Sequence, residues 1–165
     1  MKIKAVAALG LVALLAACAG DDAVDASAGA GAGGAGVAGQ PDPSTIAYFN
    51  QVVGDRVFFA FDSSEIDSQA QATLAQQAQW FRNNPAATAT IEGHTDERGT
   101  RDYNLALGAR RANAARAFLI SQGVQADRLR TVSYGKERPV ALCSDESCWA
   151  QNRRAVSVVV GAPTS

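Results

Sequence analysis

Residues 91–112 read IEGHTDERGTRDYNLALGARRA and contain the features that indicate the fold. Residues 89–94 are typical of a strand, and the polar residues 95–101 that follow are typical of a loop. Asp102 is the expected N-cap of a long helix, and Gly123 is the residue type that commonly follows a helix C-terminus. The stretch therefore predicts a strand, a charged loop and a helix in direct succession.

The segments on either side of this unit continue the alternation of strands and helices. Apolar residues recur at helical spacing from Ala70 to Phe81, and Pro85 follows them, so a helix is expected there. The order β-α-β-α-β…β predicts an α/β sandwich, in which helices pack on a mixed sheet. The predicted strands are residues 57–61, 89–94, 129–134 and 155–160, and the predicted helices are residues 67–84 and 102–122.

The composition excludes some classes of protein and disfavours others. The chain has 165 residues, of which 47% are hydrophobic and 19% are charged, and this is globular composition. Its 15 basic and 16 acidic residues give a net charge of −1, without the basic excess of a general nucleic-acid binder. With one His and three Cys it is poorly supplied for a catalytic zinc site, which needs about three protein ligands. No metal or other cofactor is expected.

The first 17 residues predict a secretory signal peptide that is removed from the mature chain. Two lysines precede the apolar run of residues 5–17, which is shorter than the roughly 20 residues that a spanning helix needs. The run ends in Leu15-Ala16-Ala17-Cys18, which resembles the lipobox of bacterial lipoproteins. That resemblance implies cleavage before Cys18 and its acylation. A plain signal peptide with a chance cysteine beside the cleavage site is the alternative.

Residues 18–43 predict a lipidated cysteine followed by a flexible tether. Val24 and Val37 are the only larger apolar residues after Cys18, so the segment cannot bury enough surface to offset its ordering entropy. Its r.m.s. span would be roughly 25–30 Å, which lets a domain of residues 44–165 work at a distance from the membrane. The alternative is an unstructured leader with no requirement for reach.

Four residues around the charged loop predict a small binding site. Asn104, Leu107 and Arg111 share one face of the expected helix, and Asp96 lies between the strand and the helix. A carboxylate and a guanidinium beside one cleft suit a zwitterionic ligand, because the first accepts from an ammonium group and the second binds a carboxylate. The alternative is that Asp96 and Arg111 pair with each other.

From Asp55 to Val160 the chain resembles the OmpA-like peptidoglycan-binding domain family. Several separated motifs occur in the right order, which is more specific than any one motif. The matching motifs are Val57 to Asp62, Glu92 to Asp96 with Gly99, Tyr103 to Leu107, Arg110 to Ala112, Tyr134 to Pro139 and Asn152 to Arg154.

The resemblance implies a ligand and a role for each site residue. The ligand is the diaminopimelate residue of peptidoglycan stem peptides. Asp96 receives its ammonium group and Arg111 its carboxylate. The residues that line the same pocket are Asn104 and Leu107 on one side and Phe61 and Asp62 on the other.

The resemblance also implies partners, location and the absence of catalysis. Such a chain is not an enzyme: it binds the cell wall noncovalently and links it to the outer membrane, with its domain in the periplasm. Ala19 favours the outer membrane, because Asp at that position retains enterobacterial lipoproteins at the inner membrane. The implied protein partners are the propeller protein TolB, other Tol proteins and OmpA-like porins. TolB is expected on a surface that overlaps the wall-binding face. A peptidoglycan hydrolase, with released fragments and a bound metal, is the competing hypothesis.

Three further features have structural interpretations. Cys143 and Cys148 predict a disulfide, because a secreted chain enters an oxidising compartment; a zinc pair would lack obvious third and fourth ligands. His94 has no partner set for catalysis, and the family resemblance implies a hydrogen-bonded scaffold residue. Arg153 and Arg154 are expected to pair with carboxylates or carbonyls near the last strand.

Overall fold

The computed structural model describes residues 40–164. The predicted signal peptide, Cys18 and the tether up to residue 39 lie outside the described residues. The elements in chain order are α1 (Ile46–Tyr48), the π-helical turn η1 (Phe49–Gly54), β1 (Arg56–Phe58), α2 (Ser68–Asn83), β2 (Thr88–His94), α3 (Arg101–Ser121), the 3-10 turn η2 (Ala126–Arg128), β3 (Leu129–Gly135), α4 (Glu146–Asn152) and β4 (Arg154–Val160).

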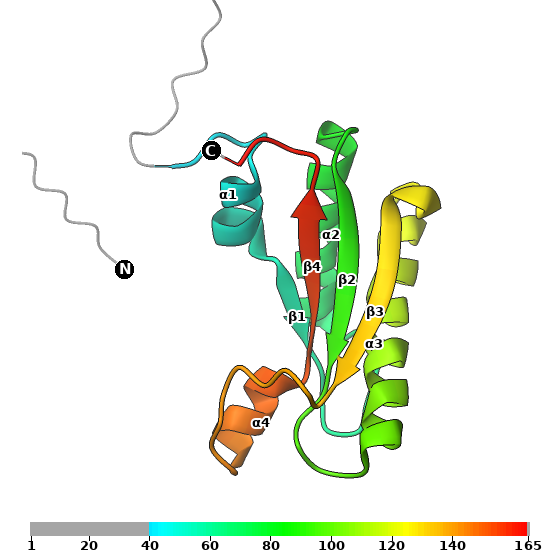
Figure 1. Cartoon of the computed structure of the whole chain (residues 1–165). Helices are drawn as coiled ribbons and strands as arrows, with labels where there is room; N and C mark the ends of the chain where they lie inside the picture. Colours follow the sequence, from blue (N-terminus) through cyan, green and yellow to red (C-terminus); the bar gives the residue numbers. More distant parts are fainter. Residues whose placement is uncertain (1–39, 165) are drawn as a thin grey trace, which may run out of the picture. The chain divides into compact units, whose positions relative to one another are not determined.

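The described strands form one mixed sheet, which confirms the predicted architecture. Its order is β1-β4-β2-β3, with β4 antiparallel to both neighbours and β2 parallel to β3. Helix α3 connects the two parallel strands, as a crossover between parallel strands requires. Figure 1 shows α2 and α3 on the same face of this sheet. The carboxyl ends of β1, β2 and β3 therefore meet at one end of the sheet, where β4 begins.

The hydrophobic core lies between the two long helices and the sheet. Leu74 and Phe81 from α2, Ile91 from β2 and Leu119 from α3 are at most 1% exposed. The segment before β1, where no helix or strand was predicted, forms α1 and η1 and buries Phe49 against Phe81, with 5.6 Å between ring centroids. This packing holds α2 against the start of the domain.

The helix ends follow local capping chemistry, with one correction to the sequence interpretation. The side chain of Asp67 caps α2 by accepting from the Ala70 N–H at 2.8 Å. The N-cap of helix α3 lies two residues earlier than expected: the Thr100 hydroxyl caps the helix by accepting from the Tyr103 N–H, and Asp102 does not. Asp102 lies in the first turn instead, where a negative charge favours the helix dipole. Gly123 follows α3 with φ 93°, as predicted.

The first strand is shorter than predicted. It pairs with β4 only over Arg56–Phe58, whereas a strand was expected to continue to residue 61. The carbonyls of the next two residues turn to buried guanidinium groups: Phe59 O accepts from Arg153 Nε at 3.0 Å, and Ala60 O accepts from Arg111 Nη2 at 3.2 Å. These contacts turn the chain toward the end of the sheet, where the next residues line a cavity.

Helix α4 has no counterpart among the elements predicted from the sequence. It is seven residues long and lies between β3 and β4, where only a disulfide-stapled connection was expected. The Asp145 side chain begins it by accepting from the Ser147 N–H at 2.8 Å.

Two glycines bring α3 unusually close to β2. A Cβ on Gly93 would overlap the carbonyl oxygen of Gly108, and a Cβ on Gly108 would lie 2.9 Å from the Gly93 carbonyl oxygen. Arg111 is one turn beyond Gly108 on α3, so this close approach brings its side chain to the end of β2.

We predict that Gly93→Ala lowers the free energy of unfolding by about 3 kcal/mol, because the added methyl group forces α3 away from β2. Denaturant unfolding would measure this loss. Ala106→Ser adds one atom at an exposed position of the same helix and should stay within about 0.5 kcal/mol of the parent chain. A loss below about 1 kcal/mol for Gly93→Ala would contradict the close contact.

Candidate functional site

A small cavity of about 170 Å³ lies between the end of β2 and the start of α3. All six residues that the sequence proposed as a ligand site line it, together with four others. The lining residues are Phe61, Asp62, Thr95, Asp96, Arg98, Gly99, Tyr103, Asn104, Leu107 and Arg111. The site thus combines the turn after β1, the loop after β2 and one face of α3.

Arg111 is fully buried and is held by carbonyl groups from two separate segments. Its Nε donates to Ser63 O at 2.7 Å, its Nη1 to His94 O at 2.9 Å and its Nη2 to Ala60 O at 3.2 Å. These bonds use three of the five N–H groups of the guanidinium. The side chain therefore fixes the turn after β1 against the end of β2.

The charge of Arg111 has no carboxylate partner among residues 40–164, because none of the ion pairs found there includes it. Burial and the nearby Arg153 charge lower the pKa of Arg111 to about 10, although Asp96 and Asp62 act in the other direction. It remains cationic at neutral pH. A buried cation without an acidic partner beside a cavity is suited to bind an anionic group.

Asp96 pairs with arginines other than Arg111, so the alternative of a direct Asp96–Arg111 pair is wrong. Its Oδ2 lies 2.6 Å from Arg98 Nη2 and 3.4 Å from Arg153 Nη1. Its Oδ1 accepts from the backbone N–H of Arg98 at 3.1 Å and from Arg98 Nε at 3.2 Å. Burial raises the pKa of Asp96, but these hydrogen bonds and charges outweigh it and hold the pKa below its ordinary value.

The other predicted residues form the walls of the cavity. Asn104 is buried, and its Nδ2 donates to the carbonyls of Arg98 at 2.8 Å and Thr100 at 3.0 Å, so it ties the loop to α3. Leu107 adds a buried apolar wall. Asp62 has φ 53°, a conformation that Asp adopts more readily than most residues, and its carboxylate accepts from the Tyr103 hydroxyl.

Arg98 is the most important site residue that the sequence reasoning missed. Its guanidinium carbon lies 4.2 Å from the centroid of the Phe61 ring and 4.0 Å from that of Trp149, so it contacts both rings. The sequence could have indicated the Arg98–Asp96 pair, because neighbouring opposite charges in a short loop can pair. Trp149 is far away in sequence and had no such signal. Tyr103 had one, since it precedes Leu107 by one helical turn.

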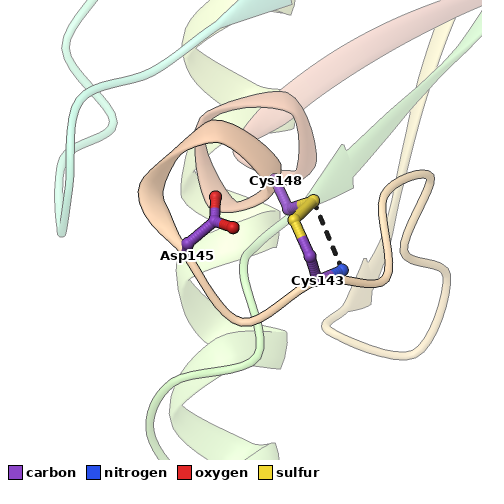
Figure 2. Close-up of side chains that lie close together, drawn as sticks. All are labelled: Cys143, Asp145 and Cys148. Carbon is purple, nitrogen blue, oxygen red and sulfur yellow. Dashed lines mark hydrogen bonds between the residues drawn. A yellow bond between two sulfur atoms is a disulfide. The ribbon is translucent and has the colours of Figure 1, made fainter.

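The structure confirms the predicted disulfide, which joins helix α4 to the loop just before it. Cys143 and Cys148 are joined, with 5.6 Å between their Cα atoms, and the Cys143 N–H donates to the sulfur of Cys148 (Figure 2). Asp145 lies close enough to share a metal ion with both cysteines, but sulfurs joined in a disulfide are not the thiolates that bind metals.

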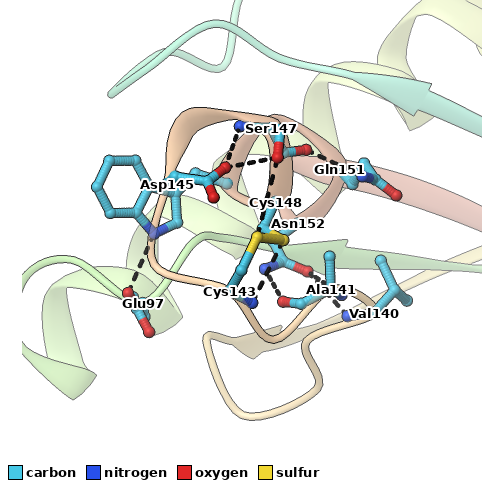
Figure 3. The surroundings of a disulfide bond; sticks show 10 residues. Glu97, Val140, Ala141, Cys143, Asp145, Ser147, Cys148, Gln151 and Asn152 are labelled. Atoms are coloured by element: carbon cyan, nitrogen blue, oxygen red, sulfur yellow. Dashed lines mark hydrogen bonds between the residues drawn. A yellow bond between two sulfur atoms is a disulfide. The ribbon is translucent and has the colours of Figure 1, made fainter.

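Polar contacts fix α4 on two sides. Asn152 bridges to the backbone of Val140 and Ala141 (Figure 3). On the other side, Trp149 Nε1 donates to Glu97 Oε1 at 3.1 Å. The disulfide and these contacts place Trp149 beside Arg98.

Arg153 and Arg154 pair with carboxylates and carbonyls near the last strand, as expected. Arg153 Nη2 pairs with Glu146 Oε1 at 2.5 Å, in addition to its bonds to Phe59 and Asp96. Arg154 donates to the carbonyls of Asn152 at 3.2 Å and Arg138 at 3.1 Å.

His94 is buried at the end of β2, but its ring is not hydrogen-bonded as the family resemblance implied. Neither ring nitrogen has a hydrogen-bond partner, and Glu92 Oε2 lies 3.6 Å from Nε2. The ring stacks on Tyr134 with 5.6 Å between centroids. Burial, followed by the charges of Arg154 and Arg138, lowers the pKa of His94 to about 4. It is therefore a neutral packing residue near pH 7.

A family model and the sequences of relatives both place the chain in the same protein family. The family model described as "OmpA family" matches residues 58–154. The peptidoglycan-associated lipoprotein of Agrobacterium fabrum is 57% identical over 158 residues, which cover 96% of this chain and 88% of that protein. The peptidoglycan-associated lipoprotein of Rhizobium meliloti is 60% identical over 125 residues, covering 76% of this chain and 71% of that protein.

Solved structures agree with the fold. The crystal structure of the peptidoglycan-associated lipoprotein from Burkholderia pseudomallei has a TM-score of 0.67 and 45% identity, covering 72% of this chain and 100% of that chain. The C-terminal domain of Helicobacter pylori MotB has a TM-score of 0.60 at 22% identity, covering 64% of this chain and 84% of that chain, and supports the fold alone. Among residues 40–164, no helix combines the length and apolar character needed to cross a membrane.

We predict that His94 titrates with a pKa of about 4 in the folded chain. Because this is the only histidine, its ring signals in NMR spectra at varied pH report the value directly. The unfolded chain binds the proton near pH 6.5, so stability is full above that value and falls as the pH drops toward 4. His94→Phe should reduce this pH dependence, and a folded-state pKa near 6.5 would contradict the assignment.

Proposed function

The chain belongs to the OmpA family, and we propose that its folded domain binds peptidoglycan noncovalently through the diaminopimelate residue of the stem peptide. Family membership identifies a binding protein and not an enzyme. The names of the relatives support the wall-binding activity. The family resemblance supplies diaminopimelate as the ligand, and the separated charges of the site suit its zwitterionic end.

The observation that carries the proposal is the separation of two buried, opposite charges beside one cavity. Arg111 has a cationic head group with no acidic partner in the described domain, and Asp96 is an anion on the same cavity. The free end of diaminopimelate presents a carboxylate and an ammonium group on one carbon. A carboxylate on Arg111 gains charge-assisted hydrogen bonds, while the ammonium group gains the Asp96 carboxylate. Asn104 holds the loop after β2 in place, and Leu107 forms an apolar wall beside the bound group.

We further propose that the mature protein is a lipoprotein of the outer membrane, anchored by acylated Cys18, with its domain in the periplasm. The similarity to the Agrobacterium protein, named as a lipoprotein, covers 96% of the chain and so extends beyond the described domain. Several acyl chains give a firm anchor where one gives only marginal binding. A domain anchored in this way joins the membrane to the wall, and repeated weak contacts along the wall act together.

We propose TolB as the protein partner, which would place the chain in the Tol–Pal system of envelope integrity and cell division. Support comes from the family resemblance, which implies this partner, and from exposed apolar side chains at the site end of the sheet. Phe61 is 62% exposed and Leu142 is 86% exposed, and apolar groups of this kind favour protein contacts. Other Tol proteins and OmpA-like porins are further candidates.

We predict that a peptide containing diaminopimelate binds the domain roughly tenfold or more tightly than the same peptide with lysine, which lacks the free carboxylate. Titration calorimetry would measure both dissociation constants. Asp96→Asn should weaken both peptides, because both carry the ammonium group. Equal affinity of the parent domain for the two peptides would contradict the role of Arg111.

We predict that TolB and the cell wall compete for the chain. Purified sacculi should sediment the protein, and saturating TolB should leave it in the supernatant. Asp96→Asn should lose sedimentation yet keep TolB binding, because a protein-sized interface does not depend on one small cavity. Sedimentation of TolB together with the chain and the sacculi would contradict overlapping sites.

A further inference from the structure

The carboxylate of Asp96 has no free acceptor position in this structure. A carboxylate has about four lone-pair positions on its two oxygens. Here it receives four donors: the backbone N–H, Nε and Nη2 of Arg98 and Nη1 of Arg153. A ligand ammonium group can therefore bind Asp96 well only if one of these donors leaves.

Arg98 is the donor that can leave. The Arg98 side chain is 33% exposed, whereas that of Arg153 is 7% exposed and also bonds Phe59 O and Glu146. Moving Arg153 would leave buried groups without partners, which is costly. Arg98 can swing into solvent, because its remaining ionic contact is a 3.8 Å approach to the exposed Glu146.

Two aromatic rings hold Arg98 in its present position. Its guanidinium contacts Phe61 and Trp149, at 4.2 Å and 4.0 Å from the ring centroids. Stacking on aromatic rings is a favoured environment for guanidinium groups. Trp149 is itself fixed, since its indole donates to Glu97 and its helix is joined to the preceding loop by the disulfide (Figure 3).

We propose that Arg98 is a specificity-determining residue that occupies Asp96 in the free protein and is displaced by the ammonium group of the ligand. Phe61 and Trp149 are the positioning residues that hold it when no ligand is present. This inference rests on the proposed function, and it adds which ligands can open the site.

The exchange selects ligands by charge. Asp96 is 5% exposed, and when Arg98 leaves only Arg153, at 3.4 Å, remains as its cationic partner. The loss of the shorter ion pair from a buried carboxylate is unfavourable. A ligand with an ammonium group replaces the charge that departs. A ligand with only a carboxylate does not, so Arg98 stays in place and keeps the acidic end of the cavity closed.

The test compares two peptides on matched variants of the full mature chain. One peptide carries diaminopimelate, and the other carries 2-aminopimelate, which keeps the free carboxylate but lacks the ammonium group. Arg98→Gln should bind the diaminopimelate peptide about three- to tenfold more tightly than the parent, as expected for removal of a partly exposed ion pair. It should not bind the 2-aminopimelate peptide more tightly. Titration calorimetry would give all four dissociation constants.

Three further variants separate displacement from other causes. Arg98→Lys keeps the charge but loses the two-pronged bond, so its affinity should lie between those of the parent and Arg98→Gln. Trp149→Leu should tighten binding in the parent and have no effect in Arg98→Gln. Arg101→Gln makes the same charge change at a side chain that is 73% exposed and pairs with Glu137; it should stay within about twofold of the parent.

The outcomes distinguish this inference from the function on which it rests. No binding of the diaminopimelate peptide by the parent chain would overturn both. Normal binding by the parent, with unchanged or weaker binding by Arg98→Gln, would overturn the inference alone. An equal gain in affinity for the 2-aminopimelate peptide would also overturn it. So would an Arg98→Lys variant that binds the diaminopimelate peptide no more tightly than the parent.

Discussion

The site depends on the burial of the Arg111 guanidinium at the end of the sheet. Its hydrogen bonds to Ala60, Ser63 and His94 join the turn after β1, the end of β2 and helix α3. Taking this cation out of water is costly, and the three carbonyls offset part of the cost with partial negative charge. They do not neutralise it. The same contacts that close the fold therefore leave a positive charge beside the cavity, and structure and binding share one residue.

The surrounding elements serve to keep that charge and the Asp96 carboxylate apart. The contact between Gly93 and Gly108 brings Arg111 to the end of β2, while Arg98 and Arg153 hold Asp96. If the two opposite charges met, each would satisfy the other and the cavity would offer a zwitterion little. Because each charge has other partners, a zwitterionic ligand can replace Arg98 on Asp96 with its ammonium group. Its carboxylate can then add hydrogen bonds to Arg111.

Local and periodic signals in the sequence predicted the α/β fold and the four residues that face the cavity from the loop after β2 and from α3. Phe61 and Asp62 were expected from the family resemblance alone. The helix α2, the loop after β2 and the face of α3 follow from apolar spacing, caps and turns. The predicted end of β1 was three residues too late, because the carbonyls of Phe59 and Ala60 accept hydrogen bonds from arginines distant in sequence. Helix α4 and the contact of Trp149 with Arg98 depend on tertiary packing, which no local pattern reports.

The most direct measurement is a crystal structure of the mature chain bound to a peptide that contains diaminopimelate. The account predicts the free carboxylate of the ligand within hydrogen-bonding distance of the Arg111 guanidinium, and the ammonium group on Asp96 with the Arg98 side chain moved aside. A ligand bound elsewhere on the domain, or one in this cavity with its carboxylate turned away from Arg111, would contradict it.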